Sequence, residues 1–388
     1  MSVDLKHSLR KLEFPTCVRE ALNQLEGLCA SQSVGRVNIK QADLAMEIIA
    51  EFVFCETDRG RAKKQKLTCI QQLQLLEVLS DYFSYLSNGH ESARNTVFML
   101  LFPTTHLERA GILVKFVSMA IAIKNHQVLA STGIVMQQVG CGSKFSADLA
   151  EGLVEDYFIL LPKVQAMLDD LPVTAPLFTA NLLTALTELY GSIDKSAVPE
   201  NLVALITKWL TEHPSLCYTA IITNLQPALP LGGIPMPALT PYVGLLNLCF
   251  RWCICCPLNN NTSSLYSQLH LALLQSLEES FHSKLIPQPR NIIPVQILSS
   301  FIPILVNKVK QLSKQHPNDS EVEKNIQLSL DRLAQAIQVA LATESLFGNK
   351  EDLLNRLEVL AKRNRLLEIV LKTHQTKSFT IETPFVYV

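Results

Sequence analysis

Apolar residues recur along this chain with the period of an α-helix, and proline or glycine separates one such stretch from the next. The clearest stretch lies between residues 325 and 341, where the apolar positions are Ile326, Leu330, Leu333, Ile337 and Leu341. Spacings of three and four place these side chains on one face of a helix. Pro317 precedes the stretch, and Ser320 followed by Glu323 predicts a capping box at its start.

The same pattern recurs through the chain. Leucine-rich stretches at 73–86, 182–189 and 199–209 end near Asn88-Gly89, Gly191 and Pro214. No stretch sustains a two-residue alternation, so no sheet is predicted, although residues 378–388 are compatible with an extended segment. Roughly sixteen to eighteen helices of ordinary length are too many for one bundle core. The predicted fold class is therefore all-α, as an irregular α-solenoid of stacked antiparallel helices of the HEAT or armadillo kind.

One segment divides the helical pattern. Residues 225–241 contain five prolines and a Gly-Gly pair, which exclude a continuous helix. We therefore predict an N-terminal helical array at 1–224, a Pro/Gly-rich connector at 225–241, a C-terminal array at 242–372 and a tail at 373–388.

Charge and hydropathy exclude several classes of protein. A net charge of −1 does not favour direct nucleic-acid binding, which needs clustered Lys and Arg. The first residues lack the apolar core of a secretory signal, so the ten cysteines are expected to stay reduced. The longest apolar stretch, from Ala110 to Ile123, is interrupted by Lys115 and is too short to span a membrane. It predicts a buried helix, and no membrane association is expected.

The sequence lacks the phosphate-loop, dinucleotide, nucleophile-elbow and zinc-protease motifs, so no enzyme activity, cofactor or small-molecule substrate is expected. One cluster of thiols lies in an apolar stretch, at Cys249, Cys253, Cys255 and Cys256. An α-helix would place the first, second and fourth of these on one face, but structural zinc needs four ligands, normally on loops. We interpret these cysteines as core residues and leave a metal or redox site as the alternative. His270, between two leucines, is likewise interpreted as a packed residue.

A basic run stands out at residues 59–66. Its cations are Arg59, Arg61, Lys63, Lys64 and Lys66. Three interpretations stay open: a solvated loop, a nuclear-import or partner-docking site, and RNA contact. No aromatic residue interleaves the run, so it lacks the stacking platform of single-stranded RNA binders.

Six segments in order resemble the Integrator complex subunit fifteen family. They are LQLLEVLSDYF (73–83), KFVSMAIAI (115–123), EDYFILLP (155–162), LTPYVGLLNLCFRWCICCPL (239–258), LYSQLHLALLQSL (265–277) and SLDRLAQAIQVALATESL (329–346). The resemblance runs from about residue 4 to about residue 371. Two departures are a short Asn/Ser loop after Pro257 and a short C-terminal tail, where relatives carry longer segments.

The resemblance implies a helical, non-catalytic scaffold in a nuclear assembly that accompanies RNA polymerase II. It implies a link between the module of Integrator subunits ten, thirteen and fourteen and the rest, with the tenth as the most direct partner. It further implies support of small nuclear RNA 3'-end processing and of transcription attenuation. The expected localisation is nuclear, with some protein in the cytoplasm. A cytosolic α-solenoid adaptor and an all-α metal enzyme stay open as alternatives.

The helix at 320–346 also carries polar residues away from the apolar positions. Asp331, Arg332 and Gln335 are the predicted partner-binding residues on this face. The alternative is that Asp331 and Arg332 bond to neighbouring helices of the same chain.

Overall fold

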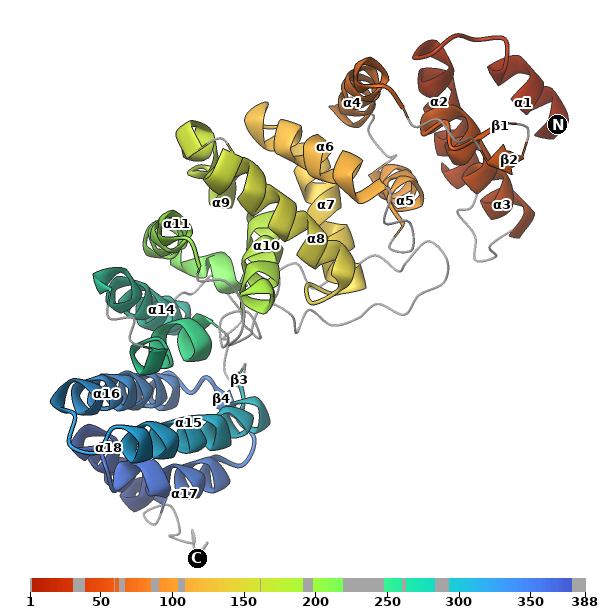
Figure 1. Ribbon diagram of the computed structural model, residues 1–388. Coiled ribbons are helices and arrows are strands. Elements are labelled where there is room, and N and C mark those ends of the chain that lie inside the picture. Colours follow the sequence, from red (N-terminus) through yellow and green to blue (C-terminus); the bar gives the residue numbers. More distant parts are fainter. Residues whose placement is uncertain are drawn as a thin grey trace, which may run out of the picture. The chain divides into compact units, whose positions relative to one another are not determined.

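A computed structural model describes residues 2–30, 39–58, 60–62, 67–84, 91–103, 109–160, 162–190, 198–218, 248–259, 263–282 and 293–378. Within these ranges the chain is almost entirely helical, which confirms the predicted all-α class (Figure 1). The described residues form two compact units, the first ending at Leu189 and the second beginning at Tyr190. The connector predicted at 225–241 lies outside the described residues.

The first unit contains α-helices, two π-helices (η1, η3), one 3-10 helix (η4) and a short strand pair. Their bounds are α1 Ser2–Leu9, α2 Thr16–Ala30, α3 Ile39–Ile48, η1 Ile49–Val53, β1 Thr57–Asp58, β2 Arg61–Ala62, α4 Cys69–Ser84, α5 Glu91–Leu101, α6 Ala110–Ala122, α7 His126–Val139, α8 Lys144–Val154, η3 Glu155–Leu160, η4 Pro162–Leu168, α9 Leu171–Thr174 and α10 Pro176–Leu189. In this unit α2 packs on α4 and α5, α4 on α6 and α7, α5 on α7, α6 on α8, and both α7 and α8 on α10. Each long helix therefore buries its apolar face on helices close to it in sequence.

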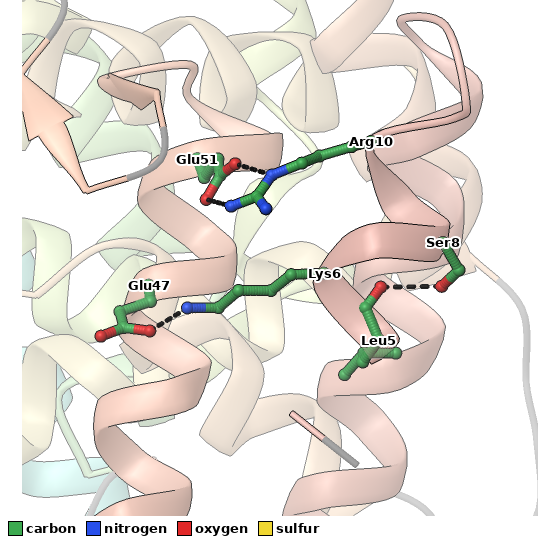
Figure 2. Close-up of polar contacts among 6 residues, drawn as sticks. All are labelled: Leu5, Lys6, Ser8, Arg10, Glu47 and Glu51. Atoms are coloured by element: carbon green, nitrogen blue, oxygen red, sulfur yellow. Dashed lines mark hydrogen bonds and ion pairs between the residues drawn. The ribbon is translucent and has the colours of Figure 1, made fainter. Parts of the chain in front are cut away.

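Apolar burial stabilises the position of α1 on the first unit more than its ion pairs do. Leu9, at the end of α1, is fully buried, which stabilises the docked helix by roughly 1.5–3 kcal/mol. Lys6 pairs with Glu47, and the Arg10 guanidinium donates to both Glu51 carboxylate oxygens at 2.7 and 3.1 Å (Figure 2). Partly exposed pairs of this kind contribute about 0–1 kcal/mol each, so they orient α1 rather than dock it.

A buried cation, Arg109 at the start of α6, bonds to the end of α5. The Arg109 side chain is 2% exposed and donates to both Glu56 carboxylate oxygens at 2.7 and 2.8 Å. It also donates to the Leu101 carbonyl at 3.0 Å and lies 4.4 Å from the centre of the Phe54 ring. The charge is therefore compensated on every side, as a buried guanidinium requires.

The second unit contains α-helices, a π-helix (η6), two 3-10 helices (η5, η7) and a second strand pair. Their bounds are α11 Glu200–Glu212, η5 Pro214–Tyr218, η6 Leu248–Ile254, η7 Pro257–Asn259, α14 Ser264–His282, β3 Ile293–Pro294, α15 Val295–Gln315, α16 Ser320–Ala342, β4 Leu346–Phe347, α17 Lys350–Ala361 and α18 Arg365–Ser378. Here α14 packs on α11, η6 and α16, and helices α15 to α18 lie side by side (Figure 1). The last helix continues past the predicted tail boundary at 373, and residues 379–388 lie outside the described part of the chain.

The prediction that the chain has no sheet is wrong at two places. Strands β1 and β2 pair antiparallel, Thr57 with Ala62, around Gly60, whose φ of +79° suits the turn. Strands β3 and β4 pair in parallel, Ile293 with Leu346. Each strand has only two residues, which is too short for an alternating pattern to be visible in the sequence.

The predicted apolar positions of α16 are confirmed, and its cap is corrected. Ile326, Leu330, Leu333 and Ile337 are buried, while Leu341 is half-buried. The cap is Asp319 rather than Ser320: its side chain accepts from the backbone N–H groups of residues 321 and 322 at 2.9 and 3.4 Å. Asp319 has the extended backbone that the cap position requires, and Ser320 is already helical.

Two further helices test the same pattern. In α4, which covers the predicted stretch 73–86 as far as Ser84, Leu76, Leu79 and Phe83 are buried, but Leu73 is 67% exposed. The last apolar residue of that stretch, Leu86, lies outside the described residues. The helix predicted over the longest apolar stretch is confirmed as α6, which ends at Ala122 and keeps Lys115 exposed. Among the described helices, none is both long and apolar enough to cross a membrane.

The buried face of α16 gives a stability prediction. Replacing Leu333 by Ala removes a side chain that is 5% exposed, so the free energy of unfolding should fall by about 2–5 kcal/mol. Lys324→Ala, on the exposed side of the same helix, should change it by less than about 0.5 kcal/mol. Urea unfolding of the full chain followed by circular dichroism compares the two. Equal midpoints would contradict the assigned core face.

Candidate functional site

An open groove lies between α16 and the first turns of α18. It is lined by Gln327, Asp331 and Gln335 from α16 and by Asn364, Arg365, Leu366 and Ile369 at the start of α18. We call it the α16–α18 groove. Its volume is about 460 Å³. Two of the three predicted partner-binding residues, Asp331 and Gln335, are therefore brought together on one concave surface.

Asn364 fixes α18 against α16 at the floor of this groove. Its amide nitrogen donates to Asp331 Oδ1 at 2.8 Å and to Gln327 Oε1 at 3.0 Å. Its carbonyl oxygen accepts from the backbone N–H of Leu367 at 2.8 Å, so the same side chain caps α18. Asn364 is 4% exposed. The Asp331 carboxylate therefore already has a partner inside the chain, on the side that faces α18.

The α18 wall of the groove is apolar. Leu367, Val370 and Leu371 are buried against the rest of the unit, as one face of an amphipathic helix should be. Leu366 and Ile369, three residues apart, are 37% and 51% exposed and line the groove instead. The helix thus has apolar residues on a second face, which packing within the described residues covers only in part.

Arg332 does not lie on the exposed face that the sequence predicts, and this placement is corrected. Its side chain is 3% exposed and points into the unit. One terminal nitrogen donates to the Cys253 carbonyl at 2.7 Å and lies 3.7 Å from the Cys256 sulfur, and the other donates to Ser267 Oγ at 2.7 Å. The physical reason is that the Cys253 carbonyl, near the end of the π-helix η6, is buried and needs a donor, while Ser267 on α14 is a half-buried acceptor within reach of the same guanidinium.

Gln335 connects the groove to a buried histidine. The His270 ring lies 3.1 Å through Nε2 from Gln335 Oε1, and His270 is 2% exposed. Burial lowers the pKa of His270 to about 4, and the nearby Arg332 charge acts in the same direction, while the bond to Gln335 opposes both. His270 is therefore neutral at neutral pH, and its interpretation as a packed residue is confirmed.

The cysteine cluster lies where the helix is not an α-helix. The helix predicted through these residues is instead the π-helix η6, followed by a bend and the 3-10 helix η7, so the expected shared face does not form. Cys253 and Cys256 are buried and Cys255 is half-buried, while the side chain of Cys249 lies outside the described part. Burial raises the pKa of Cys256 despite the opposing effect of Arg332. Among the described residues, no group of three or more His, Cys, Asp or Glu could hold a metal ion.

The predicted basic run is described only in part. Arg61 is exposed and lies in β2 of the short hairpin. Arg59, Lys63, Lys64 and Lys66 lie outside the described residues.

The sequence analysis missed the α18 side of the groove. Leu366 and Ile369 belong to the run RLLEIVL, whose apolar residues at 366, 367, 369, 370 and 371 are too many for one face of a surface helix. That excess predicts a helix with two apolar faces. Asn364, one position before the helix, matches the preference of Asn for the cap.

The buried position of Arg332 gives a second prediction. Arg332→Met keeps the stem but removes the buried bond to the Cys253 carbonyl and the half-buried bond to Ser267, so the free energy of unfolding should fall by about 1–3 kcal/mol. Arg365→Met, at an exposed position of the groove, should stay within about 0.5 kcal/mol of the parent protein. Thermal melting measures both. If the two variants melt alike, the internal role of Arg332 is wrong.

Comparison with known proteins places the chain in a family. The model of the family described as Integrator complex subunit 15 matches residues 3–362. The Integrator complex subunit 15 of Drosophila melanogaster is 34% identical over 396 residues, which cover 97% of this chain and 99% of the relative. Those of Danio rerio and Homo sapiens are 30% and 29% identical, over 95% of this chain and 80% and 86% of their own lengths. The chain belongs to the Integrator complex subunit 15 family.

Proposed function

We propose that the protein is a non-catalytic scaffold subunit of the Integrator complex. The observation that carries this proposal is the family match over nearly the whole chain, residues 3–362. The environments of Cys253 and His270 agree with it, because both side chains are buried in packing rather than gathered around an open cavity. A scaffold needs rigid helices and exposed contact surfaces, and no reaction centre.

We further propose the finer role that the family resemblance implies. The protein would link the module of Integrator subunits ten, thirteen and fourteen to the rest of the complex, with the tenth as its direct partner. In that position it would support small nuclear RNA 3'-end processing and attenuation of RNA polymerase II transcription, and it would be nuclear, with some protein in the cytoplasm.

The contacts of the first unit support an irregular α-solenoid as the scaffold. Helices α2, α5, α7 and α10 contact one another in succession, and α4, α6 and α8 do the same. Two parallel rows of this kind are what stacked helix pairs produce, since each pair packs only on its neighbours. The different helix lengths and the π and 3-10 segments make the stack irregular.

We propose the α16–α18 groove as a partner-binding surface. Leu366 and Ile369 supply apolar area, and Gln335 and Arg365 supply polar groups around it. Asp331 contributes its carboxylate beside Asn364. Arg332 acts in binding only by holding α16 in place, because its guanidinium is buried.

A purification experiment tests the complex and the groove together. The tagged protein should recover Integrator subunits from nuclear extract. Arg365→Glu combined with Leu366→Ser and Ile369→Ser should weaken that recovery about tenfold or more, and it should lower the melting temperature far less than Leu333→Ala does, because Leu366 and Ile369 are 37% and 51% exposed. Val359→Ser on α17, where Val359 is also 51% exposed, is the matched control and should recover the subunits normally.

Two outcomes would count against these proposals. Recovery of trafficking or cytoskeletal proteins with no Integrator subunit would overturn the complex assignment. Normal recovery by the triple groove variant would keep the assignment and place the contact surface elsewhere on the chain.

The basic run at 59–66 is proposed as an import or docking site. Replacing Arg59, Arg61, Lys63, Lys64 and Lys66 by Gln should leave melting unchanged, within about 0.5 kcal/mol, and should lower the nuclear fraction of the protein seen by fluorescence microscopy. Replacing the exposed lysines 310, 314 and 324 by Gln is the control for a loss of positive charge in general. If the nuclear fraction equals that of the control variant, the basic run is a solvated loop and not an import or docking site.

A further inference from the structure

Large apolar side chains are exposed on the irregular segment that follows α8. Ile159 and Leu160 in the π-helix η3 are 65% and 61% exposed, and Met167 in the 3-10 helix η4 is 43% exposed. The two elements pack against each other and belong to the first unit. We call this the η3–η4 surface. It is distinct from the α16–α18 groove, which belongs to the second unit.

The η3–η4 surface is held on a fixed frame. Tyr157 is 3% exposed, and its hydroxyl donates to the Ser118 carbonyl of α6 at 2.9 Å. Leu168, at the end of η4, and Leu171, at the start of α9, are also buried. The wider turn of a π-helix changes the direction of the residues that follow it, and such turns recur at functional sites. Within η3, Tyr157 is therefore anchored inward, whereas Ile159 and Leu160 face solvent.

The apolar area continues past η4. The Lys124 ammonium pairs with the Asp170 carboxylate at 2.7 Å, which joins the turn after η4 to the end of α6. Beside this pair, Ile123 and Val173 are also exposed, at 57% and 67%. Isolated exposed aliphatic residues are ordinary, but five large ones on connected elements indicate a contact surface.

The charge around these apolar residues is negative. From residue 123 to residue 174 the chain carries three basic residues, Lys124, Lys144 and Lys163, of which Lys124 pairs with Asp170. It carries six acidic residues, which are Asp148, Glu151, Glu155, Asp156, Asp169 and Asp170. Glu155, four residues before Ile159, is exposed, and so is Glu151 in the last turn of α8. An apolar centre with an acidic rim is complementary to an apolar face flanked by cations.

We propose that the η3–η4 surface docks an amphipathic helix of a partner protein, with the helix's apolar stripe on Ile159, Leu160 and Met167 and its flanking Lys and Arg residues beside Glu151, Glu155 and Asp156. A helix presents apolar side chains every three or four residues, which suits a few aliphatic contacts spread over two short elements. The proposal does not depend on which complex the protein enters.

The acidic charges argue against two other occupants of this surface, a second copy of this chain and a lipid membrane. A second copy of this chain on a two-fold axis would bring the same acidic rim against itself, which costs energy through like-charge repulsion. A membrane leaflet of anionic lipids would be repelled in the same way. A cationic partner helix is the occupant for which the acidic rim is attractive.

The test uses the full-length protein and a defined probe. The probe is a fluorescein-labelled helical peptide of about 18 residues with a leucine face flanked by lysines, and its counterpart replaces every lysine by glutamate. Fluorescence anisotropy should show that the parent protein binds the lysine peptide. The variant Ile159→Ser with Leu160→Ser should bind it roughly tenfold or more weakly, and so should the variant Glu155→Lys with Asp156→Lys. The glutamate peptide should bind roughly tenfold or more weakly than the lysine peptide.

The control variant is Ile70→Ser with Leu73→Ser on α4, since these residues are 70% and 67% exposed in the same unit. It should bind the lysine peptide as the parent protein does, and all three variants should keep the parent melting temperature. Equal weakening by the control variant, or equal binding of the two peptides, would overturn the proposal. Concentration-dependent dimerisation in sedimentation velocity that Ile159→Ser with Leu160→Ser abolishes would also overturn it, in favour of self-association.

Discussion

Buried backbone carbonyls near the ends of helices are a constraint that both units share. A carbonyl that leaves the α-helical ladder and is shielded from water needs a donor from elsewhere. In the second unit Arg332 supplies it to Cys253 near the end of η6, and in the first unit Arg109 supplies it to Leu101 at the end of α5. Each guanidinium also bonds a third element, through Ser267 and Glu56 respectively. Removing either arginine would therefore break the contacts that hold three segments together, not a single hydrogen bond.

This constraint also shapes the α16–α18 groove. Because Arg332 is committed to the interior, the groove has polar groups that are largely bonded to one another, with Asn364 between Asp331 and Gln327. Satisfied polar groups add little affinity for a partner, since binding must first break their bonds. Leu366 and Ile369 have no such competing bonds, and burying their exposed area gives binding energy without that loss. Binding strength should therefore come from α18, and orientation from the polar wall of α16.

The sequence predicts the parts of the fold that follow the 3.6-residue period. Leu330 and Leu333 of α16 and the whole of α6 were assigned correctly because their apolar spacing is that of an α-helix packed on one side. The period carries no information about π-helices, so η3 and η6 were missed, and with them the real positions of the cysteines. The positions of polar side chains are still harder to predict from the sequence. Arg332 and Asp331 are adjacent in sequence, and only the acceptors near η6 and on α14, distant in the chain, decide that the arginine turns inward.

The two proposed contact surfaces differ in the charges around their exposed apolar residues. Around Ile159 and Leu160 the neighbouring charges are mainly acidic. The α16–α18 groove instead has one cation, Arg365, and one anion, Asp331, beside an exposed Glu368–Lys372 pair, so its charges balance. Apolar area alone would bind any hydrophobic segment, including a second copy of the chain, so specificity must come from the rim. An acidic rim favours a cationic segment, and a rim whose charges balance does not. The two proposed surfaces would therefore select different partners, and a chain with two selective surfaces could hold two proteins at once, as a scaffold subunit must.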